Sequence, residues 1–161
     1  MLEKTNVVGG RFRLDLLLES SGTLATWRGW DLKEQGDVVL KLATGMARDH
    51  QLRLAYEAEL LGRLNCPHIV PLLAAGREGE NYFVAMPKVG HQNLRERLKQ
   101  GVLPITEVML LGVGLLRALE AVHAQGLFHR DVKPENILLD SPLTRAVLID
   151  FGLASEVAPS G

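Results

Sequence analysis

HRDVKPEN, at positions 129–136, is a polar segment that lies between an expected long helix and a short apolar run. Further along the chain, Asp150 directly follows the apolar residues Val147-Leu148-Ile149. Asp131, Asn136 and Asp150 are oxygen-bearing side chains that a turn between the two runs can bring to one place. Oxygen ligands without thiols or imidazoles suit a hard cation such as Mg²⁺. The pattern therefore indicates a Mg²⁺ site built from loop residues.

The residues around this segment have helical and hairpin patterns. Residues 106–125 repeat apolar side chains at the spacing of an amphipathic helix. One stripe of that helix carries Val108, Leu111, Leu115, Leu119 and Val122. Residues 94–100 predict a shorter helix, and the apolar runs 137–139 and 146–149 predict a small hairpin. The second half of the chain is therefore expected to be mainly helical.

The first half of the chain has a different pattern. Mostly alternating apolar runs between turn residues predict strands over 12–18, 24–30, 37–43, 70–75 and 81–86. The segment 48–64 instead has helical spacing. Five antiparallel strands with one inserted helix form a small α+β lobe. The boundary to the helical half is expected at 87–90.

Two charged residues occupy positions where the pattern favours apolar ones. Lys41 lies inside the apolar run 38–42, and Glu57 lies on the apolar stripe of the helix over 48–64. A carboxylate at such a position needs a cationic partner or exposure to water. We predict that the two side chains pair. The alternative is that both extend to solvent from the edge of a core.

Four motifs in order resemble those of eukaryotic-type serine/threonine protein kinase domains, in particular bacterial ones. Residues 129–136 match the catalytic loop, with Val132 in place of the common leucine, and 150–152 match the Asp-Phe-Gly motif. Residues 38–41 correspond to the strand that ends in the family's lysine, and Glu57 to the family's helix glutamate. The resemblance covers residues 11–155, and the Lys-Pro pair at 133–134 is the form typical of serine/threonine kinases.

The resemblance implies an α+β, protein-kinase-like bilobal fold. Residues 1–86 correspond to the N-lobe, a five-stranded antiparallel sheet with one helix. Residues 87–90 correspond to the hinge, and 91–161 to the first, mainly helical part of the C-lobe. The Ala-Pro-Glu motif and the later C-lobe helices are not in this sequence. We therefore expect a truncated form that transfers phosphate slowly or not at all.

The resemblance also implies a role for each motif residue in moving the γ-phosphoryl group of ATP to protein Ser or Thr hydroxyls. Lys41 would hold the α- and β-phosphates, and Glu57 would orient it. Asp150 and Asn136 would be the Mg²⁺ ligands. Asp131 would accept or orient the substrate hydroxyl, and Lys133 would neutralise charge on the transferred group. The adenine site would be formed by Leu18, Val39, Met86, Pro87, Val89 and Leu138.

The phosphate loop departs from the family pattern. Its three expected glycines fall on Glu19, Ser21 and Leu24, Thr26 replaces the usual valine, and Gly22 is the glycine left. Each lost N–H contact costs about 0.5–1.5 kcal/mol, which weakens ATP binding about tenfold. Two alternatives remain open. One is a pseudokinase-like nucleotide-binding or scaffolding module, and the other is a small-molecule phosphotransferase of related fold.

Composition limits the partners and the setting. The chain has 18 Lys and Arg against 19 Asp and Glu, for a net charge of −1. We therefore expect no nucleic-acid partner, and no membrane contact in this segment because its apolar runs are short. Cys66 is the single cysteine, so a reducing, cytoplasmic location is expected. The helix over 106–125 would be partly uncovered in a truncated form, which predicts self-association.

Overall fold

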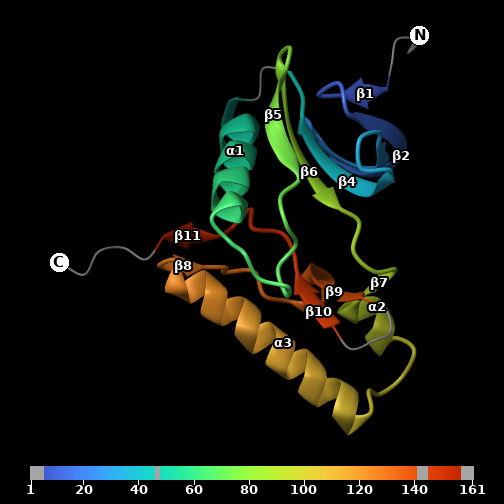
Figure 1. Ribbon diagram of the computed structural model, residues 1–161, viewed down its shortest axis with the longest axis vertical. Coiled ribbons are helices and arrows are strands. Elements are labelled where there is room, and N and C mark those ends of the chain that lie inside the picture. Colours follow the sequence, from blue (N-terminus) through green and yellow to red (C-terminus); the bar gives the residue numbers. More distant parts are fainter. Residues whose placement is uncertain (1–5, 46–47, 141–144, 157–161) are drawn as a thin grey trace, which may run out of the picture. The chain divides into compact units, whose positions relative to one another are not determined.

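The computed structural model describes residues 6–45, 48–140 and 145–156 (Figure 1). Residue contacts divide the chain into two compact units. The first contains Met1–Glu59 and Leu72–Lys88, and the second contains Leu60–Pro71 and Val89–Gly161. The chain thus changes units inside the expected hinge, and the segment Leu60–Pro71, expected in the first lobe, groups with the second unit.

The first unit contains a six-stranded antiparallel sheet with the strand order β1-β2-β3-β4-β6-β5. The sheet consists of β1 (Val7–Val8), β2 (Phe12–Ser21), β3 (Leu24–Asp31), β4 (Gly36–Ala43), β5 (Ala74–Glu78) and β6 (Asn81–Pro87). Four of the five expected strands are present at their predicted positions, as β2, β3, β4 and β6, and the short β1 pairs with the start of β2. Helix α1 (Arg48–Gly62) is inserted between β4 and β5 and begins in this unit.

One hydrophobic cluster of the first unit lies on one face of the sheet. The alternation of β4 turns Val38 and Leu40 inward, where they pack with Phe12, Phe83 and Ala85. The rings of Phe12 and Phe83 lie 6.1 Å apart between centroids. The same alternation places Val39 and Lys41 on the opposite face of β4, so one strand serves both the core and a candidate site.

One predicted strand lies at a different position. The prediction over 70–75 is wrong at its start, because β5 covers Ala74–Glu78 and pairs with β6. The Val70 amide instead donates to the Leu148 carbonyl oxygen at 3.1 Å, and Ile69 forms a parallel bridge with Leu148. The start of this run therefore pairs in the second unit, whereas Leu73 and Ala74 pack against the core of the first unit.

The second unit combines helices with short strands. Its helices are α2 (Leu94–Leu98), α3 (Ile105–Ala124) and the 3₁₀ turn η1 (Pro134–Asn136). Its strands are β7 (Gln92–Asn93), β8 (Leu127–Phe128), β9 (Ile137–Asp140), β10 (Arg145–Leu148) and β11 (Ser155–Glu156). The predicted hairpin is confirmed as the antiparallel pair β9 and β10, and β11 pairs with β8.

Helix α3 buries one side and exposes an apolar one. Leu111, Gly114, Ala118 and Val122 are buried, so small residues share the inner face with two of the predicted apolar ones. Val108 of the predicted stripe is exposed. An exposed face carries Ile105, Met109, Val113 and Leu116. Self-association through it stays a prediction. None of the helices in the described ranges is long and apolar enough to cross a membrane.

Candidate active site

In the first unit, β4 and α1 bring together Lys41 and Glu57. Lys41 Nζ donates to Glu57 Oε1 at 2.6 Å, and the side chains are 17% and 4% exposed. The predicted pairing is confirmed, and the snorkelling alternative does not hold for Glu57. A carboxylate buried to this degree keeps its charge only with a nearby cation and hydrogen-bond donors. The pair therefore fixes the Lys41 ammonium on the face of β4 opposite Val38 and Leu40.

In the second unit, the polar segment before β9 folds around the Asp131 carboxylate. Lys133 Nζ and Asn136 Nδ2 each donate to Asp131 Oδ2 at 2.8 Å, and Asn136 Nδ2 also donates to the Asp131 carbonyl oxygen at 2.9 Å. The hydrogen bond from Lys133, aided by the one from Asn136, holds the pKa of Asp131 below its ordinary value. Asp131 is therefore an ionised acceptor at neutral pH and suits the orientation of a hydroxyl group.

A backbone hydrogen bond joins the segment of Asn136 to the segment of Asp150. The Ile149 amide, directly before Asp150, donates to the Asn136 carbonyl oxygen at 2.9 Å. Both protons of the Asn136 amide nitrogen face Asp131, which leaves Asn136 Oδ1 as the acceptor that can meet a cation. Asp150 adopts a left-handed backbone with φ 63°. Carboxylate and amide oxygens are ligands that suit Mg²⁺, so the donor set fits the expected ion.

A metal site of other chemistry is not seen in the described part of the chain. No group of three or more His, Cys, Asp and Glu side chains is arranged there to hold an ion. The predicted pair Asn136 and Asp150 is smaller and consists of oxygen donors only. This donor set suits an ion that completes its shell with waters and substrate phosphates, as Mg²⁺ does.

His129 positions the loop through hydrogen bonds of its ring. Its ring is buried, with 2% exposure. Nδ1 accepts the Asp131 amide proton at 3.2 Å, so Nε2 carries the proton and donates to the Ile149 carbonyl oxygen at 3.1 Å. The ring also meets Phe151 edge-on, at 4.7 Å between centroids. The histidine thus ties the Asp131 segment to the residues on both sides of Asp150.

The expected adenine residues are distributed over both units. In the first, Val39 pairs with Met86 in register, and Pro87 ends β6. Leu18 is exposed on β2. In the second, Leu138 lies in β9 opposite Val147, and Val89 follows the change of unit. The adenine assignment stays a prediction.

The segment that replaces the glycine-rich loop is a tight hairpin. The β2–β3 ladder pairs Glu19 with Thr26 and Ser21 with Leu24. Gly22 lies in the turn between the strands with φ 61°, a backbone conformation that glycine adopts without strain. The strands are thus paired up to the turn, and Glu19 is exposed. The sequence departures do not prevent a hairpin at this position, although its register shifts between Leu17 and Glu19.

Comparison with known proteins agrees with the motifs. The sequence pattern of the protein kinase domain matches residues 26–161. Over 156 residues the chain is 36% identical to the serine/threonine-protein kinase PknD of Mycobacterium tuberculosis and 35% identical to PknL of the same species. A probable serine/threonine-protein kinase of Streptomyces coelicolor is 33% identical over 171 residues.

These alignments cover most of this chain but a minor part of each relative. They include 94% of the chain for PknD and PknL, and 99% for the Streptomyces protein. The covered share of the relative is 23% for PknD, 39% for PknL and 25% for the Streptomyces protein. The chain thus spans well under half the length of these curated relatives.

Proposed function

The chain belongs to the protein kinase family, and on that premise we propose that it forms the ATP-binding and catalytic-loop part of a serine/threonine protein kinase. The observation that carries the proposal is the hydrogen-bonded group around Asp131, in which Lys133 and Asn136 share one carboxylate oxygen. The Lys41–Glu57 pair supports it independently from the other unit. The names of the relatives favour Ser and Thr as acceptors.

The proposed reaction transfers the γ-phosphoryl group of ATP. A substrate hydroxyl forms the new P–O bond, the bond to the β-phosphate oxygen breaks, and ADP leaves. Asp131 orients the hydroxyl and accepts its proton. Lys133, within reach of that carboxylate, offsets charge on the transferred group, and Lys41 binds the α- and β-phosphates. Mg²⁺, when bound by Asn136 and Asp150, supplies further countercharge to the phosphates.

Positioning and countercharge carry most of the catalysis in such a reaction, because its transition state spreads charge over the equatorial oxygens. The lowered pKa of Asp131 agrees with a role of this carboxylate in positioning the hydroxyl group. A carboxylate of low basicity holds a hydroxyl in line without removing its proton early. We also place the reaction in the cytoplasm, because ATP and reduced thiols belong to that compartment.

A nucleotide-binding or scaffolding module without transfer activity is the second candidate. The observation that favours it is the β2–β3 hairpin, which carries Glu19, Ser21 and Leu24 where the family pattern has glycines. Side chains at these positions reduce the backbone contacts to phosphates. Both candidate functions predict ATP binding that this loop weakens. They differ in whether the protein transfers the phosphoryl group.

ATP binding is tested first, by thermal unfolding. Millimolar Mg-ATP is expected to raise the Tm, because a ligand that binds the folded state stabilises it by mass action. Lys41→Met is expected to remove the rise, whereas Glu59→Gln, an exposed change on α1, is expected to keep it. An unchanged Tm of the parent chain at millimolar Mg-ATP contradicts nucleotide binding.

Transfer is tested with γ-labelled ATP and a mixture of protein acceptors. The proposal expects slow label incorporation on Ser and Thr, lost in Asp131→Asn while the Mg-ATP rise in Tm remains. Label on Tyr contradicts the acceptor assignment. A Tm rise without any transfer, including from chains extended by the activation segment, favours the binding module.

A further inference from the structure

The hairpin that replaces the glycine-rich loop is tied to α1 at its tip. Thr23 Oγ1 and His50 Nδ1 share a hydrogen bond of 2.7 Å. Thr23 lies in the turn between β2 and β3, and His50 lies in the first turn of α1. Both side chains are partly buried. The contact therefore joins the hairpin to a helix that the strand pairing of the sheet does not connect to it.

The backbone of the tip is held by the end of β4. Thr44, directly after β4, donates its amide and hydroxyl protons to the Thr23 carbonyl oxygen at 2.7 and 3.2 Å. Thr44 lies three residues beyond Lys41. A strand rises about 3.3 Å per residue, so the tied tip lies about 10 Å along the sheet from Lys41.

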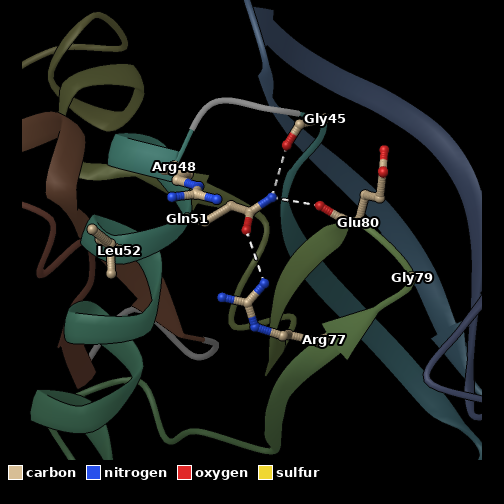
Figure 2. A pocket seen from close by; sticks show the side chains of 7 residues that line it. All are labelled: Gly45, Arg48, Gln51, Leu52, Arg77, Gly79 and Glu80. Carbon is tan, nitrogen blue, oxygen red and sulfur yellow. Dashed lines mark hydrogen bonds between the residues drawn. The ribbon is translucent and has the colours of Figure 1, made fainter.

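The start of α1 is anchored to the same part of the sheet. Gln51 follows His50, and its Nε2 donates to the carbonyl oxygens of Gly45 and Glu80, as Figure 2 shows. Gln51 Oε1 accepts from Arg77 Nη1 at 3.3 Å. The Gln51 side chain is buried. His50 therefore extends from a helix start that is fixed both to the end of β4 and to the hairpin of β5 and β6.

One side of α1 carries the contacts to both phosphate-binding parts of the first unit. His50 and Glu57 are seven residues apart, which is close to two helical turns, so they lie on the same side. Leu54 between them is buried. Glu57 binds Lys41, and His50 binds the tip of the hairpin. Helix α1 therefore sets the position of the hairpin relative to the Lys41 ammonium.

A hairpin that is fixed in advance matters more in this chain than in one with the usual glycines. Side chains at Glu19, Ser21 and Leu24 reduce the backbone contacts available to phosphates. Ordering a loop when a ligand binds also costs conformational free energy, which is subtracted from the affinity. A hydrogen bond that orders the tip before the ligand arrives removes part of that cost.

We propose that the Thr23–His50 hydrogen bond positions the hairpin for the phosphates of ATP. The two residues are positioning residues, since they act through the hairpin backbone and need not touch the nucleotide. This role rests on the proposed ATP binding and deepens it. It assigns part of the affinity for the triphosphate to a contact between the β2–β3 turn and α1.

The test compares a ligand with phosphates to one without them. Ligand-observed NMR measures the Kd of Mg-ATP and of adenosine for the parent chain and its variants. Thr23→Val replaces the hydroxyl with a methyl group. It is expected to weaken Mg-ATP binding about fivefold, which corresponds to about 1 kcal/mol for one neutral hydrogen bond. The affinity for adenosine is expected to stay unchanged.

Three further variants show whether the hydroxyl and the ring act together. Thr23→Ser keeps the hydroxyl and is expected to bind Mg-ATP as the parent does. Ser20→Ala removes an exposed hydroxyl from the same hairpin and is the matched control. His50→Phe is expected to weaken Mg-ATP binding as much as Thr23→Val does. The double variant is expected to lose no more than either single one, because residues that share one contact are not additive.

Hydrogen exchange gives a readout without nucleotide. Thr23→Val is expected to speed amide exchange over residues 19–24 while exchange in β4 stays as in the parent, because the loss of the contact frees the tip and leaves the sheet folded. Unchanged exchange at the tip contradicts the positioning role.

The outcomes separate this role from the proposed function. A parent chain that binds no Mg-ATP overturns both. A parent chain that binds Mg-ATP, with the same Kd in Thr23→Val, overturns the positioning role alone. Equal weakening of Mg-ATP and adenosine shows a general structural change and also overturns it, as do additive losses in the double variant or an equal loss in Ser20→Ala.

Discussion

Lys41 Nζ lies 2.6 Å from Glu57 Oε1, and the glutamate of this pair is almost completely buried. Lys41 on the strand and Glu57 on the helix are joined by a charge-assisted hydrogen bond. Each of them occupies a position where the pattern of its own element favours an apolar residue. Forming such a buried ion pair and breaking it change the free energy of unfolding by different amounts. Its net contribution to stability is small, whereas removal of one partner leaves the other with an uncompensated charge.

We expect Glu57→Gln to destabilise the protein by about 3 kcal/mol, because it leaves the Lys41 ammonium beside a neutral amide. Equilibrium denaturation in urea measures the change. Glu59→Gln changes an exposed glutamate on the same helix and is expected to stay within about 0.5 kcal/mol of the parent. Equal losses in the two variants contradict a special role of the Lys41–Glu57 pair.

A second prediction concerns acid stability. Arg11 Nε and Nη2 donate to the two oxygens of the buried Asp31 carboxylate at 2.8 and 2.6 Å, and the Lys33 and Glu34 amides add two further hydrogen bonds. The hydrogen bonds from Arg11, with those from the two amides, lower the pKa of Asp31 to about 2. The unfolded chain therefore binds this proton at a higher pH than the folded chain does.

The stability that Asp31 contributes is thus complete above its ordinary pKa of about 4 and is lost as the pH falls towards about 2. We expect Asp31→Asn to lower the free energy of unfolding at pH 7 by about 2 kcal/mol and to flatten its decline between about pH 4 and pH 2. Urea denaturation at a series of pH values measures both effects. Asp37→Asn, at an exposed carboxylate paired with Arg28, is the control, and a decline as steep in Asp31→Asn as in the parent contradicts the prediction.

The sequence was sufficient to predict the structure where the local pattern and the local chemistry agree. The pairing of Lys41 with Glu57 was predicted because each charged side chain lies among apolar residues of its own element, where a carboxylate needs a cationic partner. The oxygen-bearing residues of 129–136 also predicted a common site. The hydrogen bonds that join Asp131, Lys133 and Asn136 span a few residues, so a single loop segment contains them.

The sequence was insufficient where the deciding partner is distant in the chain. The run over 70–75 is apolar enough for a strand, but Val70 finds its partner at Leu148. His129 acts through the Ile149 carbonyl, which no spacing reveals, although its place at the start of the polar segment was a usable signal. Helix α3 was read from its large apolar residues, whereas Gly114 and Ala118 also face inward.

A third prediction concerns the Asp131 carboxylate. The Lys133 ammonium is the largest cause of its lowered pKa, so Lys133→Met is expected to raise the pKa of Asp131 towards its ordinary value. Carbon-13 NMR titration of labelled aspartate carboxyl groups measures the shift without any need for activity. Lys99→Met, at an exposed lysine on α2's C-terminal side, is the control. An unchanged Asp131 titration in Lys133→Met shows that Asn136 alone keeps the carboxylate ionised.

The last prediction uses two glycines of α3 that differ in what surrounds them. A Cβ atom at Gly114 would lie 2.8 Å from His68 Nδ1, which is within 2.8 Å of the Ala146 carbonyl oxygen and cannot move away without losing that hydrogen bond. A Cβ atom at Gly112 would meet nothing within 4 Å. Because alanine favours a helix interior over glycine, Gly112→Ala is expected to stabilise by about 0.5–1 kcal/mol. Gly114→Ala is expected to destabilise by about 1–3 kcal/mol, because overpacking outweighs that gain. Thermal and urea unfolding of both variants measure the difference, and a gain in both would show that α3 does not pack against His68 as described.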